Sequence, residues 1–132
     1  MSDRFRFRTP IYRVDGKFKR FEIWHCEDGF FEVARTLLVD DNATFGRSEQ
    51  CTGLKDKNGK LIYEGDVVKR HSKYSENEND VVLQVEWNCK GARYITTDKK
   101  HDNWIFSMFD YEYEILGNIH ENPELLGVNN AK

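Results

Sequence analysis

Basic and aromatic residues alternate strictly at the start of the chain. Residues 4–8 read Arg-Phe-Arg-Phe-Arg, and successive side chains of a strand point to opposite faces. The pattern predicts a strand with three arginines on one face and two phenylalanines on the other. Pro10 lacks an N–H group, so we expect it to interrupt this strand at a bend or at the edge of a sheet.

The same alternation continues through the first forty residues. Residues 18–26 predict a strand with Arg20, Glu22 and Trp24 on one face and the apolar residues Phe21 and Ile23 on the other. Residues 30–39 predict another strand, and glycine-containing turns at 14–17 and 28–29 separate the three. We interpret this region as an antiparallel β meander.

Turn signals and short strands also dominate the rest of the chain. Asn58-Gly59 predicts a hairpin with a two-residue turn in which both residues have positive φ. Strands are expected after the tight turn at 64–66 and over residues 81–88, 93–97, 104–108 and 111–116. In the longest of them, Leu83 and Val85 share one face and Val82 and Gln84 the other.

The last residues predict the start of a helix. Asn122 is a good N-cap, Pro123 suits the first helical position, and Glu124 suits the positive end of the helix. We expect one short helical turn here, followed by a frayed tail.

These elements predict a mostly β fold: an N-terminal antiparallel β meander, a C-terminal SH3-like small barrel and a short C-terminal helical turn. The expected organisation is an N-terminal β unit at residues 1–49, a barrel unit at 50–127 and a frayed tail at 128–132. Composition agrees, because 14% of the residues are aromatic and alanine is scarce.

Cysteine content indicates the cellular compartment. Cys26, Cys51 and Cys89 are an odd, widely spaced set, typical of free thiols in a reducing environment. No apolar run is long enough to span a bilayer, and the first residues do not resemble a secretory signal. We expect a cytoplasmic protein of a bacterial host cell, with no membrane partner.

Two stretches of the chain carry a recognisable pattern. Residues 51–68 read CTGLKDKNGKLIYEGDVV, and residues 114–126 read EILGNIHENPELL. In order and spacing they resemble the YopX family of phage and prophage proteins. Residues 6–8 are similar to the basic–Phe–Arg strand with which that family opens, and residues 9–11 depart from it.

This resemblance implies a phage or prophage origin, a β-rich fold with an SH3-like C-terminal part, and self-association. It supplies no catalytic residues. The motifs have a structural explanation as a hairpin turn, a tight glycine turn and a helix start. Glycine and asparagine occur first of all where the backbone needs an unusual conformation. The motif residues interpreted in this way are Gly53, Asn58, Gly59, Tyr63, Gly65, Asp66, Gly117, Asn118, Asn122 and Pro123.

No residue pattern predicts a metal or cofactor site. Zinc ligands usually come in close pairs, whereas the three cysteines are solitary. His25 and Cys26 are neighbours in a predicted strand, so they point to opposite faces and are poorly placed to chelate one ion. We therefore expect neither a metal nor a cofactor.

Catalytic patterns are equally weak. The cysteines lie in no recognisable arrangement with the four histidines, His25, His71, His101 and His120. Glu64 and Asp66, and likewise Glu112 and Glu114, are spaced to share a strand face. Such pairs arise by chance among 23 acidic residues. We expect no catalytic residues and no enzymatic activity.

Charge is distributed unevenly along the chain. Residues 1–20 contain seven basic and two acidic side chains, a net charge of +5; because the whole chain carries −3, the remainder carries −8. Alternate arginines of a strand stand about 6.6 Å apart, a row that can follow phosphates. The expected contacts to nucleic acid or to a neighbouring subunit are Arg4, Arg6, Arg8, Lys17, Lys19, Arg20 and Trp24.

The favoured interpretation is a non-enzymatic, self-associating binding module, whose arginines pair with carboxylates across a sheet or a subunit interface. The alternative is a nucleic-acid-binding module acting through the basic N-terminal strand, with Trp24 as a stacking platform. An uncharacterised enzyme is the third hypothesis. The sequence leaves the other protein partner unknown.

Overall fold

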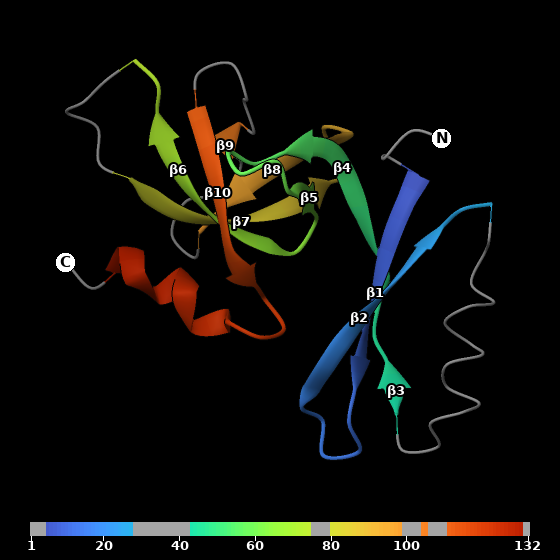
Figure 1. The fold of residues 1–132 in the computed structure, drawn as a ribbon. Helices are drawn as coiled ribbons and strands as arrows, with labels where there is room; N and C mark the ends of the chain where they lie inside the picture. Colours follow the sequence, from blue (N-terminus) through green and yellow to red (C-terminus); the bar gives the residue numbers. More distant parts are fainter. Residues whose placement is uncertain (1–4, 28–42, 75–79, 99–103, 106–110, 131–132) are drawn as a thin grey trace. The chain divides into compact units, whose positions relative to one another are not determined.

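The computed structural model describes residues 5–27, 43–74, 80–98, 104–105 and 111–130. Within them the chain is mostly β, as predicted, and divides into two compact units, Met1–Gly53 (unit 1) and Leu54–Lys132 (unit 2). The elements in Figure 1 are β1 (Arg6–Tyr12), β2 (Phe18–His25), β3 (Thr44–Phe45), β4 (Glu49–Lys55), β5 (Leu61–Tyr63), β6 (Asp66–Ser72), β7 (Val81–Asn88), β8 (Arg93–Thr97), β9 (Trp104–Ile105), β10 (Tyr111–Asn118) and the 3₁₀ helix η2 (Pro123–Asn130).

Strand β1 is the central strand of unit 1. It pairs antiparallel with β2 along its whole length, from Arg6 opposite His25 to Tyr12 opposite Phe18. On its other side it pairs over short stretches, with β4 near its start and with β3 near its end. Because both sides of β1 are covered, its residues 8–11 are buried.

Pro10 lies inside this central strand, so the prediction that it interrupts the strand or marks a sheet edge is wrong. Its carbonyl oxygen accepts a hydrogen bond from the backbone N of Gly46 at 3.0 Å. The nitrogen and oxygen of one strand residue point to the same side, so the missing N–H faces the gap between β3 and β4. The ladder to β2 therefore loses no donor.

Several predicted elements fall on residues that the structure does not describe. The strand expected at residues 30–39, the turn at 28–29 and the side chain of Arg4 lie outside the described residues. Of the strand expected at 104–108, the described part is β9.

The hairpin between β4 and β5 differs from the predicted two-residue turn. Gly59 has φ of 82°, but the one described non-glycine residue with positive φ is Ala92, so Asn58 does not adopt that conformation. The backbone N of Gly59 donates to the Asp56 oxygen at 3.0 Å, and that of Asp56 donates to the Lys60 oxygen at 2.8 Å. This is a three-residue loop, a turn closed by a glycine at positive φ.

Unit 2 is built on an antiparallel sheet with the strand order β10-β6-β7-β8-β9. One side of the sheet packs in a core of fully buried side chains from β5, β6, β7 and β10, namely Ile62, Val68, Leu83, Val85 and Tyr113. Leu83 and Val85 thus share a face, as the alternation in β7 predicted. Val82 belongs to a second cluster.

The second cluster lies under the C-terminal helix. Leu126 of η2 packs with Val67 and Val82, and Ile119 and Leu125 contact the same cluster. The helix begins at Pro123 as predicted, but it continues to Asn130. It therefore extends into residues for which a frayed tail was expected, because its apolar side chains cover part of the sheet. None of the helices in the described residues has the length and hydrophobicity to cross a membrane.

Candidate functional site

The basic N-terminal strand is the first place where the sequence predicted function. Arg8 is 6% exposed, and its Nε donates to Oε1 of Glu49 at 2.8 Å. The two residues are direct cross-strand partners on β1 and β4. The Arg8 guanidinium also lies 4.1 Å from the centroid of the Phe21 ring. Arg8 is thus a cross-sheet ion-pair partner, as the favoured interpretation predicted, and is poorly placed to contact phosphates.

Trp24 is likewise engaged within unit 1. Its ring stacks on Phe7 with the centroids 4.6 Å apart. Its indole nitrogen donates to Oγ1 of Thr9 at 2.9 Å, and that hydroxyl lies 2.7 Å from the hydroxyl of Ser48. These contacts fix the indole against the sheet, so one face of the predicted stacking platform is already covered.

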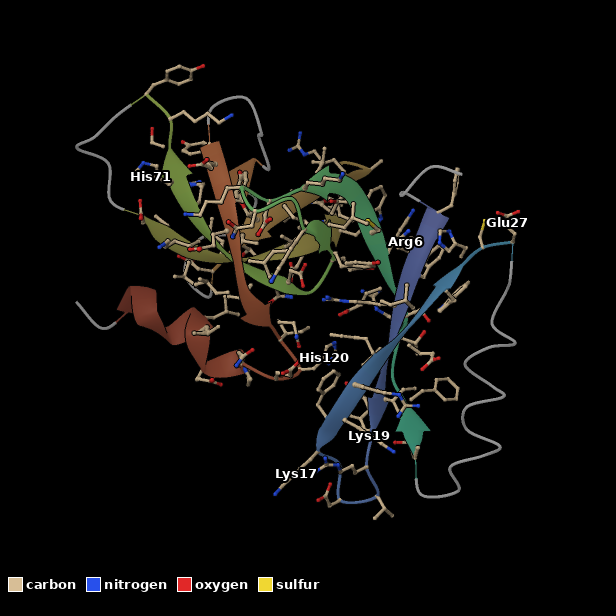
Figure 2. The ribbon with its side chains drawn as sticks, in the orientation of Figure 1. Arg6, Lys17, Lys19, Glu27, His71 and His120 are labelled. Atoms are coloured by element: carbon tan, nitrogen blue, oxygen red, sulfur yellow. The ribbon has the colours of Figure 1, made fainter. Side chains whose placement is uncertain are left out.

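The predicted basic residues do not form one surface. Opposite partners in a sheet share a face, so Arg8, opposite Ile23, lies on one face, and Arg20, opposite Ile11, lies on the other. Arg20 forms an exposed ion pair with Glu22 at 3.5 Å. In Figure 2, Lys17 and Lys19 lie near the β1–β2 turn, whereas Arg6 lies toward the opposite end of β1.

Large apolar side chains remain exposed in unit 1. Phe5 and Ile23 are each 50% exposed, and Phe45 is 47% exposed. Burying such side chains removes apolar surface from water and is the usual driving force of association. Elsewhere in unit 1, at the end of β1, burial and then the charge of Glu49 raise the pKa of Tyr12.

The first family-like motif is organised by the carboxylate of Asp56. Its Oδ1 accepts hydrogen bonds from the backbone nitrogens of Asn58 and Lys60, each at 2.9 Å. Its Oδ2 accepts from the backbone N of Ile115 on β10 at 3.1 Å. The side chain is 6% exposed. Asp56 therefore shapes the loop and ties it to the neighbouring sheet.

The glycine turn of the same motif is held in a similar way. Oδ2 of Asp66 accepts from the backbone N of Tyr63 at 2.8 Å. Gly65 has φ of 90°, donates to the Val85 oxygen at 2.7 Å and accepts from the N of Ile119 at 3.0 Å. Asp66 is only 3% exposed, so its carboxylate supports the turn and is not presented to a substrate. Gly53 also has positive φ, 83°.

The C-terminal motif depends on Asn118. Its Oδ1 accepts from the backbone nitrogens of His120 and Glu121, each at 3.0 Å, and its amide donates to Glu121 at 3.2 Å. A side chain at Gly117 would overlap that of Asn122. Glycine and asparagine are thus required here by the bend that leads from β10 into η2.

None of the three thiols, which all lie in described residues, is part of a disulfide bond. Cys51 is buried and receives a long hydrogen bond, 3.4 Å, from the backbone N of Gly53, whereas Cys26 and Cys89 are exposed. Across the part of the chain that the structure describes, no group of three or more His, Cys, Asp or Glu side chains is arranged to hold a metal ion.

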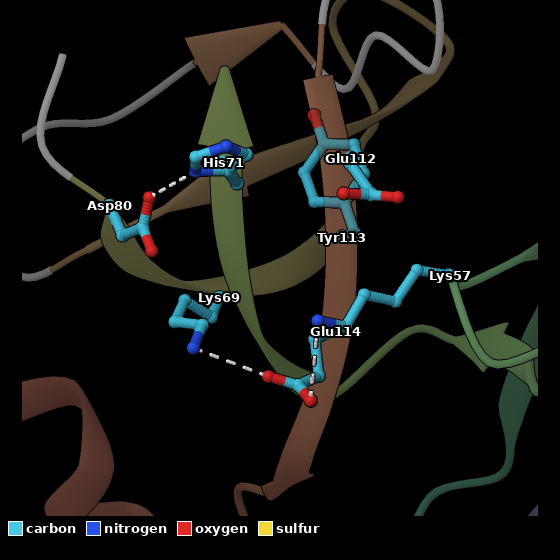
Figure 3. A pocket seen from close by; sticks show the side chains of 7 residues that line it. All are labelled: Lys57, Lys69, His71, Asp80, Glu112, Tyr113 and Glu114. Carbon is cyan, nitrogen blue, oxygen red and sulfur yellow. Dashed lines mark hydrogen bonds and ion pairs between the residues drawn. The ribbon is translucent and has the colours of Figure 1, made fainter. Parts of the chain in front are cut away.

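Unit 2 has a hollow of about 310 Å³ that the sequence did not predict. Figure 3 shows its lining, which comes mainly from β6 and β10 together with residues flanking neighbouring strands: Lys57, Lys69, His71, Asp80, Glu112, Tyr113 and Glu114. Cross-strand pairing brings Glu112 opposite His71 and Glu114 opposite Lys69. This register, which no local pattern reveals, is what assembles the hollow.

Acidic and basic side chains lie close together in the hollow. Glu114 lies 3.4 Å from Lys69 and 3.8 Å from Lys57, and Nδ1 of His71 lies 2.6 Å from Oδ1 of Asp80. The His71 and Asp80 side chains are 53% and 39% exposed. Such exposed pairs contribute little to stability. The hollow is thus lined mainly by charged side chains that are partly exposed to water.

The protein is thus a small, mostly β protein. The glycine, asparagine and aspartate residues of its two sequence motifs form turns. A family model described as "YopX protein" matches residues 19–127. The chain belongs to the YopX family. No curated protein matches it in sequence. It is similar to a solved structure described as the crystal structure of protein EF1440 from Enterococcus faecalis, with 20% identity, 91% of this chain and 97% of that chain covered, and a TM-score of 0.48.

Proposed function

We propose that this protein is a phage- or prophage-type accessory protein that acts by binding, without catalysis, and that self-association is its primary molecular behaviour. The observation that carries the proposal is the exposure of large apolar side chains in unit 1, where Phe5, Ile23 and Phe45 are each about half accessible. A small sheet with such side chains on its surface is stabilised when a partner covers them. We place the protein in the cytoplasm of its host cell.

The motif geometry supports a role without catalysis. The side-chain oxygens of Asp56, Asp66 and Asn118 accept hydrogen bonds from backbone N–H groups. The two buried carboxylates of the family motifs therefore have structural hydrogen bonds. We further propose that the curled antiparallel sheet of unit 2 forms an SH3-like barrel. Such small barrels serve many proteins as binding scaffolds.

Nucleic-acid binding through the N-terminal strand has less support. Arg8 is buried against Glu49, Arg20 pairs with Glu22, and Trp24 is stacked on Phe7. A phosphate-binding strand would instead hold its guanidinium groups on one accessible face.

The test is light scattering coupled to size exclusion on the full chain at tens of micromolar. We expect a species of at least twice the monomer mass of 15.7 kDa. A monodisperse monomer would overturn the proposal. Fluorescence anisotropy with DNA and RNA at two salt concentrations then tests the alternative, because phosphate contacts weaken steeply with salt.

A further inference from the structure

The loop between β4 and β5 contains the pair Asn58-Gly59, and no other asparagine of the chain is followed by glycine. Both residues are exposed. Apart from its neighbours in the chain, nothing lies within 4 Å of the position that a Cβ of Gly59 would take. An asparagine side chain reaches the backbone nitrogen of the next residue most easily when that residue has no Cβ. The pair therefore combines the sequence and the access that an intramolecular reaction of asparagine requires.

The reaction that this pair can undergo is deamidation. The backbone nitrogen of Gly59 loses its proton and forms a bond to Cγ of Asn58, and the side-chain nitrogen takes up the proton and leaves as ammonia. The product is a cyclic succinimide. Water then opens the ring at either of its carbonyl carbons and leaves an aspartate or an isoaspartate at position 58. The sequence of steps requires water and no other reactant.

Hydrogen bonds in the loop oppose this ring closure. The N–H of Gly59 donates to the backbone oxygen of Asp56 at 3.0 Å. Oδ1 of the same aspartate accepts from the backbone nitrogens of Asn58 and Lys60, each at 2.9 Å. Ring closure removes the proton of the Gly59 nitrogen and moves this nitrogen toward Cγ of Asn58. The loop must therefore open locally before the reaction can occur.

The loop between β1 and β2 has the same shape, and in it Asp15 stands at the position of Asn58. The Asp15 side chain is fixed there, because it accepts a hydrogen bond from the backbone N of Lys17 at 2.9 Å. The corresponding nitrogen in the loop between β4 and β5, that of Lys60, donates to Asp56 instead. This loop keeps its shape without the Asn58 amide, which leaves that amide available for ring closure.

We propose that Asn58 is a site of spontaneous deamidation and that the carboxylate of Asp56 sets its rate. Asp56 is 6% exposed, and its Oδ2 accepts from the backbone N of Ile115 at 3.1 Å. Opening the loop therefore breaks three hydrogen bonds to one buried carboxylate. In an isoaspartate the main chain runs through the side-chain carbon, which lengthens the loop by a methylene group. The modified loop no longer matches the spacing of these hydrogen bonds, so its attachment to β10 weakens.

The test follows deamidation of the full chain over time at neutral pH, by mass spectrometry of the peptide that contains Asn58 and chromatographic separation of its isoaspartate form. The same chain unfolded in guanidinium chloride gives the unprotected rate. We expect the folded wild type to react at least about tenfold more slowly than the unfolded chain. Asp56→Ala should approach the unfolded rate, and Asp56→Asn, which keeps one acceptor oxygen, should lie between. In Asn58→Ser the mass change should be absent.

The matched control is Asp66→Ala, because Asp66 is 3% exposed and accepts from the backbone N of Tyr63, outside the loop. It should lower stability and leave the deamidation rate of the folded protein unchanged; circular dichroism gives the folded fraction of each variant. If Asp66→Ala reacts as fast as Asp56→Ala at an equal folded fraction, general unfolding controls the rate and the proposal is wrong. If Asp56→Ala does not fold, Asp56→Asn decides, and a wild-type rate in that variant would overturn the proposal. A folded wild type that reacts as fast as the unfolded chain, or a mass change that persists in Asn58→Ser, would overturn it as well.

Discussion

Replacing Arg8 by alanine is expected to lower the free energy of unfolding by about 3–5 kcal/mol, because it leaves the Glu49 carboxylate buried without its partner. The two side chains are only 7% and 5% exposed. The substitution also removes the guanidinium from the Phe21 ring, 4.1 Å away. In urea unfolding, the midpoint should fall by more than about 1 M.

The matched control is Arg20→Ala in the adjacent strand. The Arg20 pair with Glu22 is 38% and 28% exposed, so we expect a loss below about 1 kcal/mol. The double variant Arg8→Met with Glu49→Leu should regain most of the stability that Arg8→Ala loses, since replacing both charges leaves no orphaned carboxylate. Equal, small effects of Arg8→Ala and Arg20→Ala would contradict the buried ion pair.

The second large effect is expected at Asp56. Asp56→Ala removes the acceptor of three backbone N–H groups and leaves that of Ile115 unpaired in a partly buried position. A hydrogen bond to a charged acceptor contributes about 1.5–3 kcal/mol, and leaving a donor unpaired adds a desolvation penalty. We expect a loss of about 3 kcal/mol or more in urea unfolding, together with faster hydrogen exchange at Ile115.

Asp15→Ala is the matched control for this loop. Asp15 occupies a loop of the same shape between β1 and β2, closed by Gly16 with φ of 84°, and its carboxylate accepts from the N of Lys17 at 2.9 Å. That site is exposed, so the expected loss is below about 1 kcal/mol. If Asp56→Ala lowered the free energy of unfolding no more than Asp15→Ala does, the hydrogen bond between the Asp56 loop and β10 would contribute nothing to stability.

Alternation of apolar and polar residues predicted the strands well where both faces of a strand are covered. Strands β7 and β8 have the predicted bounds, and the two faces of β7 enter two different clusters. In these segments the side chains themselves determine which face is buried, so the local pattern is sufficient. The mostly β fold followed from the same signal.

Features that depend on pairing partners were not accessible to local patterns. Pro10 suggested an interruption, yet the strand continues. The N–H that proline lacks would point into the gap between β3 and β4, where it is not needed for the pairing of β1 with either strand. Asn58 suggested positive φ, yet the carboxylate of Asp56 stabilises a longer loop in which only the glycine needs that conformation. In both cases a contact from another segment decides the backbone geometry.

The same limit applies to the candidate site. The row of arginines was predicted from alternation, but the burial of Arg8 depends on Glu49, forty-one positions away. The hollow in unit 2 depends on the register of β6 and β10, which places Glu112 opposite His71. Register is set by turn geometry and by the whole buried face, so a short segment does not reveal it.

Hydrogen exchange at two protein concentrations tests the central claim, association through unit 1, without changing a residue. At the higher concentration we expect slower exchange at the amides of Phe5, Ile23 and Phe45 in unit 1, because association covers these exposed side chains and excludes water from the backbone beside them. Exchange in β10 of unit 2 should not change. Concentration-independent exchange throughout unit 1, or protection confined to Tyr111–Asn118, would contradict association through unit 1.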